Sequence, residues 1–213
     1  MRKKLLKQLT MALLLTIAVP CVNAQIAHIG DILCTTGVYV SPAEFDDSGL
    51  EAMGVIFYVD ETGQHGWAVA LEDAGNYSWG NSNMYTGDTP LPNYAMYQTR
   101  AAIYDLNGEF NTQEVLAYGA TNNYSYPAFE ALDVANGWYM PAIGQLNYLY
   151  GNLVEVNDGL SATGGTVFDM TSSWNYWSST EMDSMNRCLL KSSGNIGRNS
   201  SSFVCRVRGV RSF

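Results

Sequence analysis

Apolar and polar positions follow the pattern of β-strands in the first third of the chain. Residues 32–40 predict two short strands joined by a tight turn. Residues 54–60 form a nearly continuous apolar run, which is typical of a buried strand, and residues 67–71 predict the strand that returns beside it. Residues 73–92 are rich in Gly, Asn, Asp and Pro, so we expect a loop there.

The middle of the chain changes to the period of a helix. Residues 93–106 have apolar side chains at helical spacing, and residues 111–114 resemble a capping box that opens a second helix. Residues 127–136 and 141–153 predict two more helices. The last of these has an apolar stripe that we expect to face the core, formed by Ile143, Leu146, Leu149 and Leu153.

From Val167 onward the pattern predicts strands again, at residues 176–178, 188–190 and 203–210. The order of strands, then helices, then strands predicts an α+β fold. No internal repeat and no clear domain boundary interrupts the chain after its first 24 residues. We therefore expect a single domain over residues 25–213.

Residues 1–24 have the layout of a secretory signal peptide, with cleavage expected after Ala24. An apolar run over residues 11–19, too short to span a bilayer, follows four basic residues: Arg2, Lys3, Lys4 and Lys7. A lipoprotein signal is the alternative because Cys21 follows aliphatic residues, although Pro20 stands where such signals have a small residue. No other stretch is apolar enough for a membrane helix, so no transmembrane segment is expected.

The composition is typical of proteins that act outside the cell. Hydrophobic residues make up 47% of the 213 residues and charged residues only 15%, against about 25% charged residues in an average soluble domain. Polarity comes instead from Asn, Ser, Thr, Gly and Tyr. With the signal peptide, this predicts an exported protein at the cell surface, in the periplasm or secreted. The net charge of −9 argues against nucleic acid as a partner.

The charges are unevenly distributed along the chain. Residues 25–186 hold all twenty acidic residues and one basic residue, Arg100, whereas residues 187–213 hold six basic residues and no acid. The basic residues of this last segment are interspersed with Val and Phe, as in a strand. We therefore expect the basic segment to pair with acidic neighbours in its own fold; a basic arm that binds a polyanion is the alternative.

Three cysteines remain once the signal peptide is removed: Cys34, Cys188 and Cys205. An exported chain meets oxidising conditions, which favour a disulfide. A hairpin of residues 186–191 and 203–208 would place Cys188 opposite Cys205. Pairing of the first and last strands would instead bring Cys34 to Cys205, and the spacing does not choose between these two pairings.

No motif in the chain indicates an enzyme, and no catalytic residue is assigned. The chain has no Gly-x-Ser-x-Gly elbow, no phosphate-binding loop and no His-Glu-x-x-His pattern. It has no Cys-x-x-Cys and only two isolated histidines, His28 and His65, so neither a metal site nor a cofactor is expected. Acidic pairs such as Asp46 and Asp47 are compatible with calcium binding, but most such pairs are simply solvated.

Three segments together resemble a family of exported bacterial domains. They are residues 137–141 (Gly-Trp-Tyr-Met-Pro), 176–181 (Tyr-Trp-Ser-Ser-Thr-Glu) and 207–213 (Val-Arg-Gly-Val-Arg-Ser-Phe). The family is the domain-of-unknown-function group found at the C-terminus of a Legionella collagen-like adhesin. The Gly-Asp-Ile start at residues 30–32 and the strand over residues 54–58 resemble the version found in Bacteroides-type bacteria.

The resemblance implies a C-type lectin-like fold, in which a twisted antiparallel sheet has two main helices and long loops and the N- and C-terminal strands pair. It also implies that several motif residues are signatures of the fold: Trp138, Pro141, Trp177, Arg208 and Arg211. Met140 and Gln145 depart from the Leu and Glu that are usual in the family. The sugar-binding elements of calcium-dependent lectins are missing, so that activity is not implied.

Residues 182–202 are rich in Ser, Asn and Arg, and in lectin-like proteins this region builds the exposed ligand face. Aromatic side chains beside this segment would stack on a ligand, while its Asn and Arg side chains would supply hydrogen bonds. An ordinary solvated hairpin is the alternative. The ligand contacts expected from this segment and the aromatic residues before it are Trp174, Tyr176, Asn186, Arg187, Lys191, Asn195, Arg198 and Asn199.

The leading hypothesis for function is a non-enzymatic, exported recognition domain whose ligand is a glycan or a protein. The second hypothesis is a structural subunit of a surface or envelope assembly that has no soluble ligand. A third is an enzyme, because the sulfatase-modifying formylglycine generators share the implied fold class and depend on reactive cysteines. The identity of the ligand and the oligomeric state stay open at the level of sequence.

Overall fold

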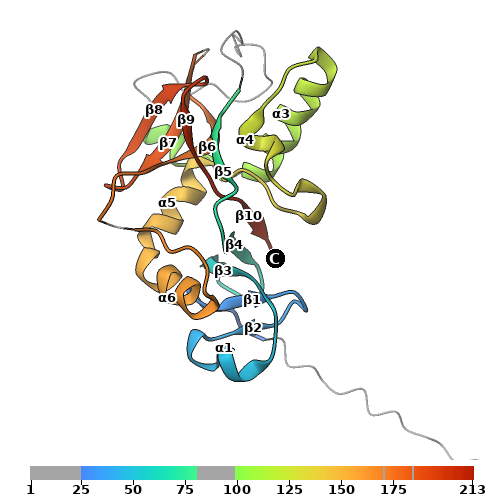
Figure 1. The fold of residues 1–213 in the computed structure, drawn as a ribbon, viewed down its shortest axis with the longest axis vertical. Helices are drawn as coiled ribbons and strands as arrows, with labels where there is room; N and C mark the ends of the chain where they lie inside the picture. The colour runs from blue at the N-terminus through green and yellow to red at the C-terminus, as the bar shows by residue number, and fades with distance from the viewer. Residues whose placement is uncertain (1–24, 81–98, 170, 184) are drawn as a thin grey trace, which may run out of the picture.

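The computed structural model describes residues 25–80, 99–169, 171–183 and 185–213. The predicted signal peptide, with Cys21, and the first part of the helix predicted at 93–106 lie outside the described residues. The α+β class is confirmed, since two five-stranded sheets are joined and covered by helices (Figure 1).

The first sheet is antiparallel and has the strand order β10-β4-β3-β1-β2. The strands predicted in the first third of the chain are confirmed here, and the short helix α1 (Pro42–Ser48) connects β2 to β3. The strand bounds are β1 Ile32–Cys34, β2 Tyr39–Val40, β3 Ala52–Val59, β4 Gly66–Ala70 and β10 Val210–Ser212.

The first and last strands share this sheet but do not pair, which corrects the expectation that they are neighbours. β3 and β4 form a tight hairpin between them, and β10 joins the free edge of β4 with Val210 opposite Val69. Neighbours in sequence pair first because a short turn costs little chain entropy. The terminal strand therefore adds to the outside of the hairpin.

The second sheet has the order β5-β9-β6-β7-β8, with β6 and β9 parallel and the other pairs antiparallel. β5 lies inside the segment predicted as a loop at 73–92, of which residues 81–92 are outside the described residues. The strand bounds are β5 Gly75–Ser78, β6 Asn175–Glu181, β7 Asn186–Lys191, β8 Ile196–Ser200 and β9 Val204–Val207.

The C-terminal hairpin is formed by β7 and β8. β7 pairs with β8 around a turn in which the Lys191 NH donates to the Asn195 carbonyl, and Gly194 in that turn has a φ of 78°. β9 inserts between β5 and β6. The hairpin of residues 186–191 and 203–208, which would have placed Cys188 opposite Cys205, therefore does not form.

The helices lie where the helical period was found, with different bounds. Two helices, α5 and α6, replace the single helix expected at residues 141–153, and they meet at Asn152. The helix bounds are α2 Thr99–Ala102, α3 Gly108–Asn122, α4 Pro127–Glu130, the 3₁₀ turn Val134–Asn136, α5 Ile143–Gly151 and α6 Leu153–Thr163.

The core has two main layers on either side of the second sheet. One face contributes Tyr176 and Leu190, which pack with Ile143 of α5 and with residues of the first sheet. The opposite face contributes Trp177 and Leu189, which pack with residues of α3 and α4. Figure 1 shows α5 and α6 along one side of the molecule and α3 and α4 along the other. The second sheet is therefore buried on both faces.

Candidate functional site

Three of the eight expected ligand contacts are buried in the protein. The exposed fraction is 4% for Trp174, 1% for Tyr176 and 0% for Arg187. The rings of Trp174 and Tyr176 pack edge to face at a centroid separation of 5.0 Å, and the Trp174 Nε1 donates to the Asp169 carbonyl (2.7 Å). These side chains cannot reach a ligand, because they lie in β6, in β7 or directly before β6 and are covered by their neighbours.

The other five expected contacts lie on the β7–β8 hairpin near the surface. Lys191, Asn195 and Arg198 are exposed, whereas Asn186 and Asn199 are half-buried. The Asn186 amide is already used, because its Nδ2 donates to both carboxylate oxygens of Asp183 at 2.9 Å. The part of the predicted face that solvent reaches is therefore a small polar surface formed by the three exposed side chains.

Arg187 belongs to a buried ion pair. Its Nη2 lies 3.7 Å from the Glu181 Oε1, and both side chains are fully buried. The guanidinium also lies 4.4 Å from the centre of the Trp79 ring, and Nη1 donates to the Asp183 carbonyl at 2.7 Å. Burial lowers the pKa of Arg187, and the Glu181 charge opposes that shift. The residue expected to contact a ligand thus holds β6, β7 and β5 together.

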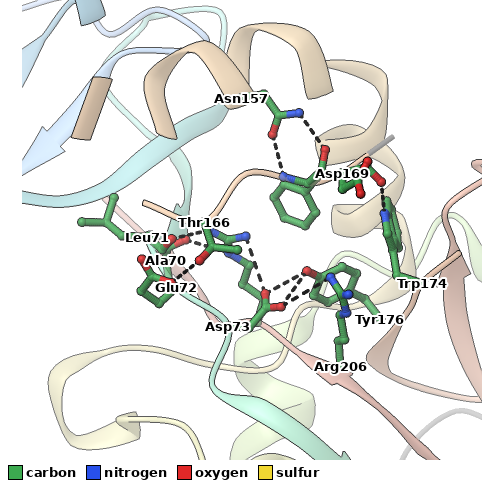
Figure 2. A network of polar contacts seen from close by, with 12 residues as sticks. Ala70, Leu71, Glu72, Asp73, Asn157, Thr166, Asp169, Trp174, Tyr176 and Arg206 are labelled. Atoms are coloured by element: carbon green, nitrogen blue, oxygen red, sulfur yellow. Dashed lines mark hydrogen bonds and ion pairs between the residues drawn. The ribbon is translucent and has the colours of Figure 1, made fainter. Parts of the chain in front are cut away.

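A second network joins Asp73 to the basic C-terminal segment (Figure 2). The Tyr176 hydroxyl donates to the two Asp73 oxygens at 2.8 and 3.0 Å, and the carboxylate lies 3.5 Å from Arg208 and 3.9 Å from Arg206. Burial, followed by the Asp73 charge, raises the pKa of Tyr176 to about 12. The Arg208 Nε donates to the Ala70 carbonyl at 2.9 Å.

These ion pairs confirm that the basic segment pairs with acids of its own fold. Arg187 meets Glu181, and Arg206 and Arg208 meet Asp73. Figure 2 shows Asp73 between Leu71, which directly follows β4, and the Tyr176 and Arg206 side chains. Three of the six basic residues of this segment are therefore paired with acids of the fold.

The three cysteines of the described residues are free and buried, which contradicts both expected disulfides. Cys188 and Cys205 lie on β7 and β9, with β6 between them, and they pack in different core clusters. Strands two places apart are separated by about 9–10 Å, beyond the roughly 7 Å that a disulfide bridges between Cα atoms. Cys34 lies in the other sheet. Burial raises the pKa of Cys188 to about 12 and of Cys205 to about 11.

The recognised motifs have structural positions in this fold. Residues 176–181 are all buried in β6. The Trp177 Nε1 donates to the Tyr77 carbonyl at 2.9 Å, and the Pro141 carbonyl accepts from the Ser179 NH at 2.8 Å. Arg211 lies over the Trp138 ring at 5.5 Å. These contacts agree with the role of fold signatures that the resemblance implied.

A groove that the sequence did not indicate runs beside the first turns of α3. Its volume is about 320 Å³, and a narrower extension of about 30 Å³ continues toward Gly137 and Trp138. The main part is lined by Leu106, Asn107, Glu109, Phe110, Gln113 and Tyr139. We call this the α3 groove. The sequence carries no motif for this groove, because its lining residues are brought together only by the fold.

A small apolar patch lies at one end of the second sheet. Met185, Phe203 and Val204 are exposed by 55%, 51% and 56%. Met185 and Phe203 directly precede β7 and β9, and Val204 is the first residue of β9. The two turns meet where the Ser201 NH donates to the Met185 carbonyl at 3.1 Å. We call these three residues the turn patch. Exposed apolar side chains that gather on adjacent turns are candidates for contacts with another protein.

The described residues contain no group of three or more His, Cys, Asp and Glu side chains arranged to hold a metal ion. Within the same residues, no helix is long and apolar enough to cross a membrane.

Comparison with solved structures finds a shared fold. The chain superposes on a fimbrial protein from Bacteroides ovatus ATCC 8483 with a TM-score of 0.67 and 18% sequence identity. The match covers 87% of this chain and 49% of that protein, so the chain spans about half the length of its structural neighbour. At this identity the similarity shows the fold alone. No protein-family model and no curated protein matches the sequence.

Proposed function

We propose that the protein is an exported subunit of a bacterial surface assembly. The observation that supports this role is the fold, which is shared over 87% of the chain with a fimbrial protein. The N-terminal layout of a signal peptide agrees with a location outside the cytoplasm. In this role the domain is a building block whose partner is a second protein subunit.

The turn patch is the surface that we propose for subunit contact. Its three apolar side chains are each more than half exposed, and they lie at or directly before the first residues of β7 and β9. Burial of apolar area provides most of the free energy of protein association. A contact there would leave the ion-paired core unchanged.

The test is light scattering of the purified protein over a range of concentrations. We expect the mean mass to rise with concentration, and we expect Phe203→Asp to weaken the association by at least about tenfold. Val154→Asp is the matched control, since Val154 is 61% exposed on α6, away from the patch. A protein that stays monomeric at every concentration contradicts the assembly role.

A recognition role is the second candidate, and the exposed end of the β7–β8 hairpin favours it. Lys191, Asn195 and Arg198 present two cations and an amide to solvent on a chain that is otherwise acidic. The resemblance to lectin-like domains favours this second candidate function. Binding to a panel of immobilised glycans and proteins that is lost in the Lys191→Ala/Arg198→Ala double variant would support it, and an unchanged binding profile would contradict it.

The proposed role is non-catalytic. A catalytic cysteine needs a lowered pKa and access to substrate, because the thiolate is the nucleophile. Here burial raises the pKa of Cys34, Cys188 and Cys205, and all three thiols are buried. This environment argues against chemistry of the formylglycine-generating type at these three residues.

A further inference from the structure

The α3 groove combines an exposed aromatic ring with polar side chains that make no hydrogen bond among the described residues. The Phe110 side chain is 53% exposed at its rim, and Tyr139, which is 3% exposed, is also among the lining residues. Asn107, Glu109 and Gln113 are exposed, and none of their side chains makes a hydrogen bond within the residues that the structure describes. Ligand sites typically pair apolar walls with a few polar groups of this kind in volumes of about 300–1,000 Å³.

We propose that the α3 groove binds a neutral carbohydrate. The two amides both donate and accept hydrogen bonds, and the Glu109 carboxylate accepts them. Sugar hydroxyls also donate and accept, so they match this set better than a group that only donates or only accepts. The apolar face of a sugar ring would lie on Phe110, as aromatic side chains stack on flat apolar surfaces.

The charge of the groove disfavours an anionic ligand. The main part and the narrow extension both have the Glu109 carboxylate among their lining residues, and neither is lined by a base. An anion would be repelled by this carboxylate, whereas a sugar hydroxyl donates a hydrogen bond to it.

The groove is also held rigid by contacts on its inner side. The Gln145 Nε2 donates to the Tyr139 hydroxyl at 3.1 Å, and that hydroxyl lies 3.0 Å from the Ser212 Oγ. The backbone of Tyr139 exchanges hydrogen bonds with Val210 at 2.8 and 3.0 Å. Thr112 accepts from the Met140 NH at 3.0 Å, which fixes α3 to the opposite wall. A preformed groove loses little entropy when a ligand binds.

The test is a titration of the isotope-labelled protein with neutral trisaccharides, followed by amide chemical shifts. The probes are maltotriose, cellotriose, mannotriose, xylotriose and N-acetylchitotriose at millimolar concentration. We expect at least one of them to shift amides of α3 and of residues 137–139. Phe110→Ala should weaken that binding by about tenfold, and Glu109→Gln should change it by less than about threefold.

Phe203→Ala is the matched control for Phe110→Ala, because the two phenylalanines are exposed by 51% and 53%. We expect the control to bind the sugar as the wild type does. No shift with any trisaccharide overturns the proposal. Binding of Nα-acetyl-lysine methylamide in place of the sugars, lost in Glu109→Gln, overturns it in favour of a cationic ligand.

The inference is independent of the assembly role. Self-association is measured without sugar and depends on Phe203, whereas sugar binding depends on Phe110. A monomeric protein that binds a trisaccharide contradicts the assembly role alone, and an oligomer that binds none contradicts the groove proposal alone.

Discussion

Among individual residues, the cations of the C-terminal segment divide between the interior and the surface. Arg187 and Arg208 are 0% and 2% exposed, whereas Lys191 and Arg198 are in contact with solvent. A buried cation requires a counter-charge, because loss of hydration costs several kcal/mol per ion. Glu181 and Asp73 provide that charge. The buried arginines therefore fix strands, and only the exposed ones are available to a partner.

Replacement of Arg187 by Met should destabilise the protein strongly. The substitution removes the cation and leaves the Glu181 carboxylate buried, a change that typically costs about 3–5 kcal/mol. Urea unfolding measures the effect. Arg198→Met is the control, since an exposed arginine should contribute less than about 0.5 kcal/mol. The double variant Glu181→Leu/Arg187→Met should regain most of the loss, and a single variant as stable as the wild type would contradict the buried pair.

The residue types between positions 174 and 199 are those of a binding face, but they do not show which side of the sheet each side chain occupies. Residue type alone therefore could not reveal that three of the expected contacts are buried: Trp174, Tyr176 and Arg187. Both faces of the second sheet are covered by helices, so alternation along β6 does not separate inside from outside. The α3 groove was missed because its walls, α3 and residues 134–139, meet only in the folded chain.

At the scale of elements, the start of α3 is set by a close approach to the segment before α5. Gly108 is the first residue of α3, and a Cβ there would lie 2.7 Å from the Ala142 nitrogen and 2.7 Å from the Met140 oxygen. Asn111, expected to open the helix as a cap, instead donates to the buried Asp105 carboxylate at 3.0 Å. The helix therefore begins four residues earlier than its sequence suggests, with Asn107 in place of Asn111 at the cap position, because tertiary contacts replace a local cap.

Gly108→Ala should destabilise the protein although alanine favours helices. The added methyl group meets backbone atoms that cannot move away freely, and overpacking of this kind costs about 1–3 kcal/mol. Gly151→Ala, in α5, is the matched control, since a Cβ there meets nothing within 4 Å and should stabilise by up to about 1 kcal/mol. Thermal unfolding of the two variants gives the comparison; equal melting temperatures would contradict the close approach at Gly108.

Helices and strands with a strong local pattern were predicted well, but the strands with which they pair in a sheet were not. The β3–β4 hairpin follows from its apolar run and a short turn, so its location was found. The pairing of β9 with β5 and β6 joins segments far apart in sequence, and no local signal specifies it. Helix α6 was not predicted as a separate helix. It follows α5 with only Asn152 between them, and the apolar pattern does not change at that residue.

For the molecule as a whole, the two sheets are joined by side-chain contacts as well as by the backbone. Ion pairs at Asp73 and the apolar cluster around α5 and α6 link them. The described cysteines are distributed over both sheets as free thiols. Among the described residues, packing and ion pairs therefore hold the sheets together without a disulfide.

A thiol titration distinguishes this arrangement from a disulfide. The native protein at pH 8 should react slowly with a thiol reagent, because burial raises the pKa of Cys188 and Cys205 well above that pH. The chain processed at Ala24 and unfolded without reductant should expose three reactive thiols. A single thiol would indicate that one of the two disulfides forms after all.

The positions of β9 and β10 have a consequence for the order of events in biogenesis. β9 occupies an interior place in the second sheet, and β10 completes the first sheet beside β4. Both strands come from residues 204–212, so neither sheet is complete until these residues have been added to the chain. A chain cut before residue 204 would leave β5 and β6 without the strand between them and β4 with an open edge, so it would lose the closing strand of both sheets at once.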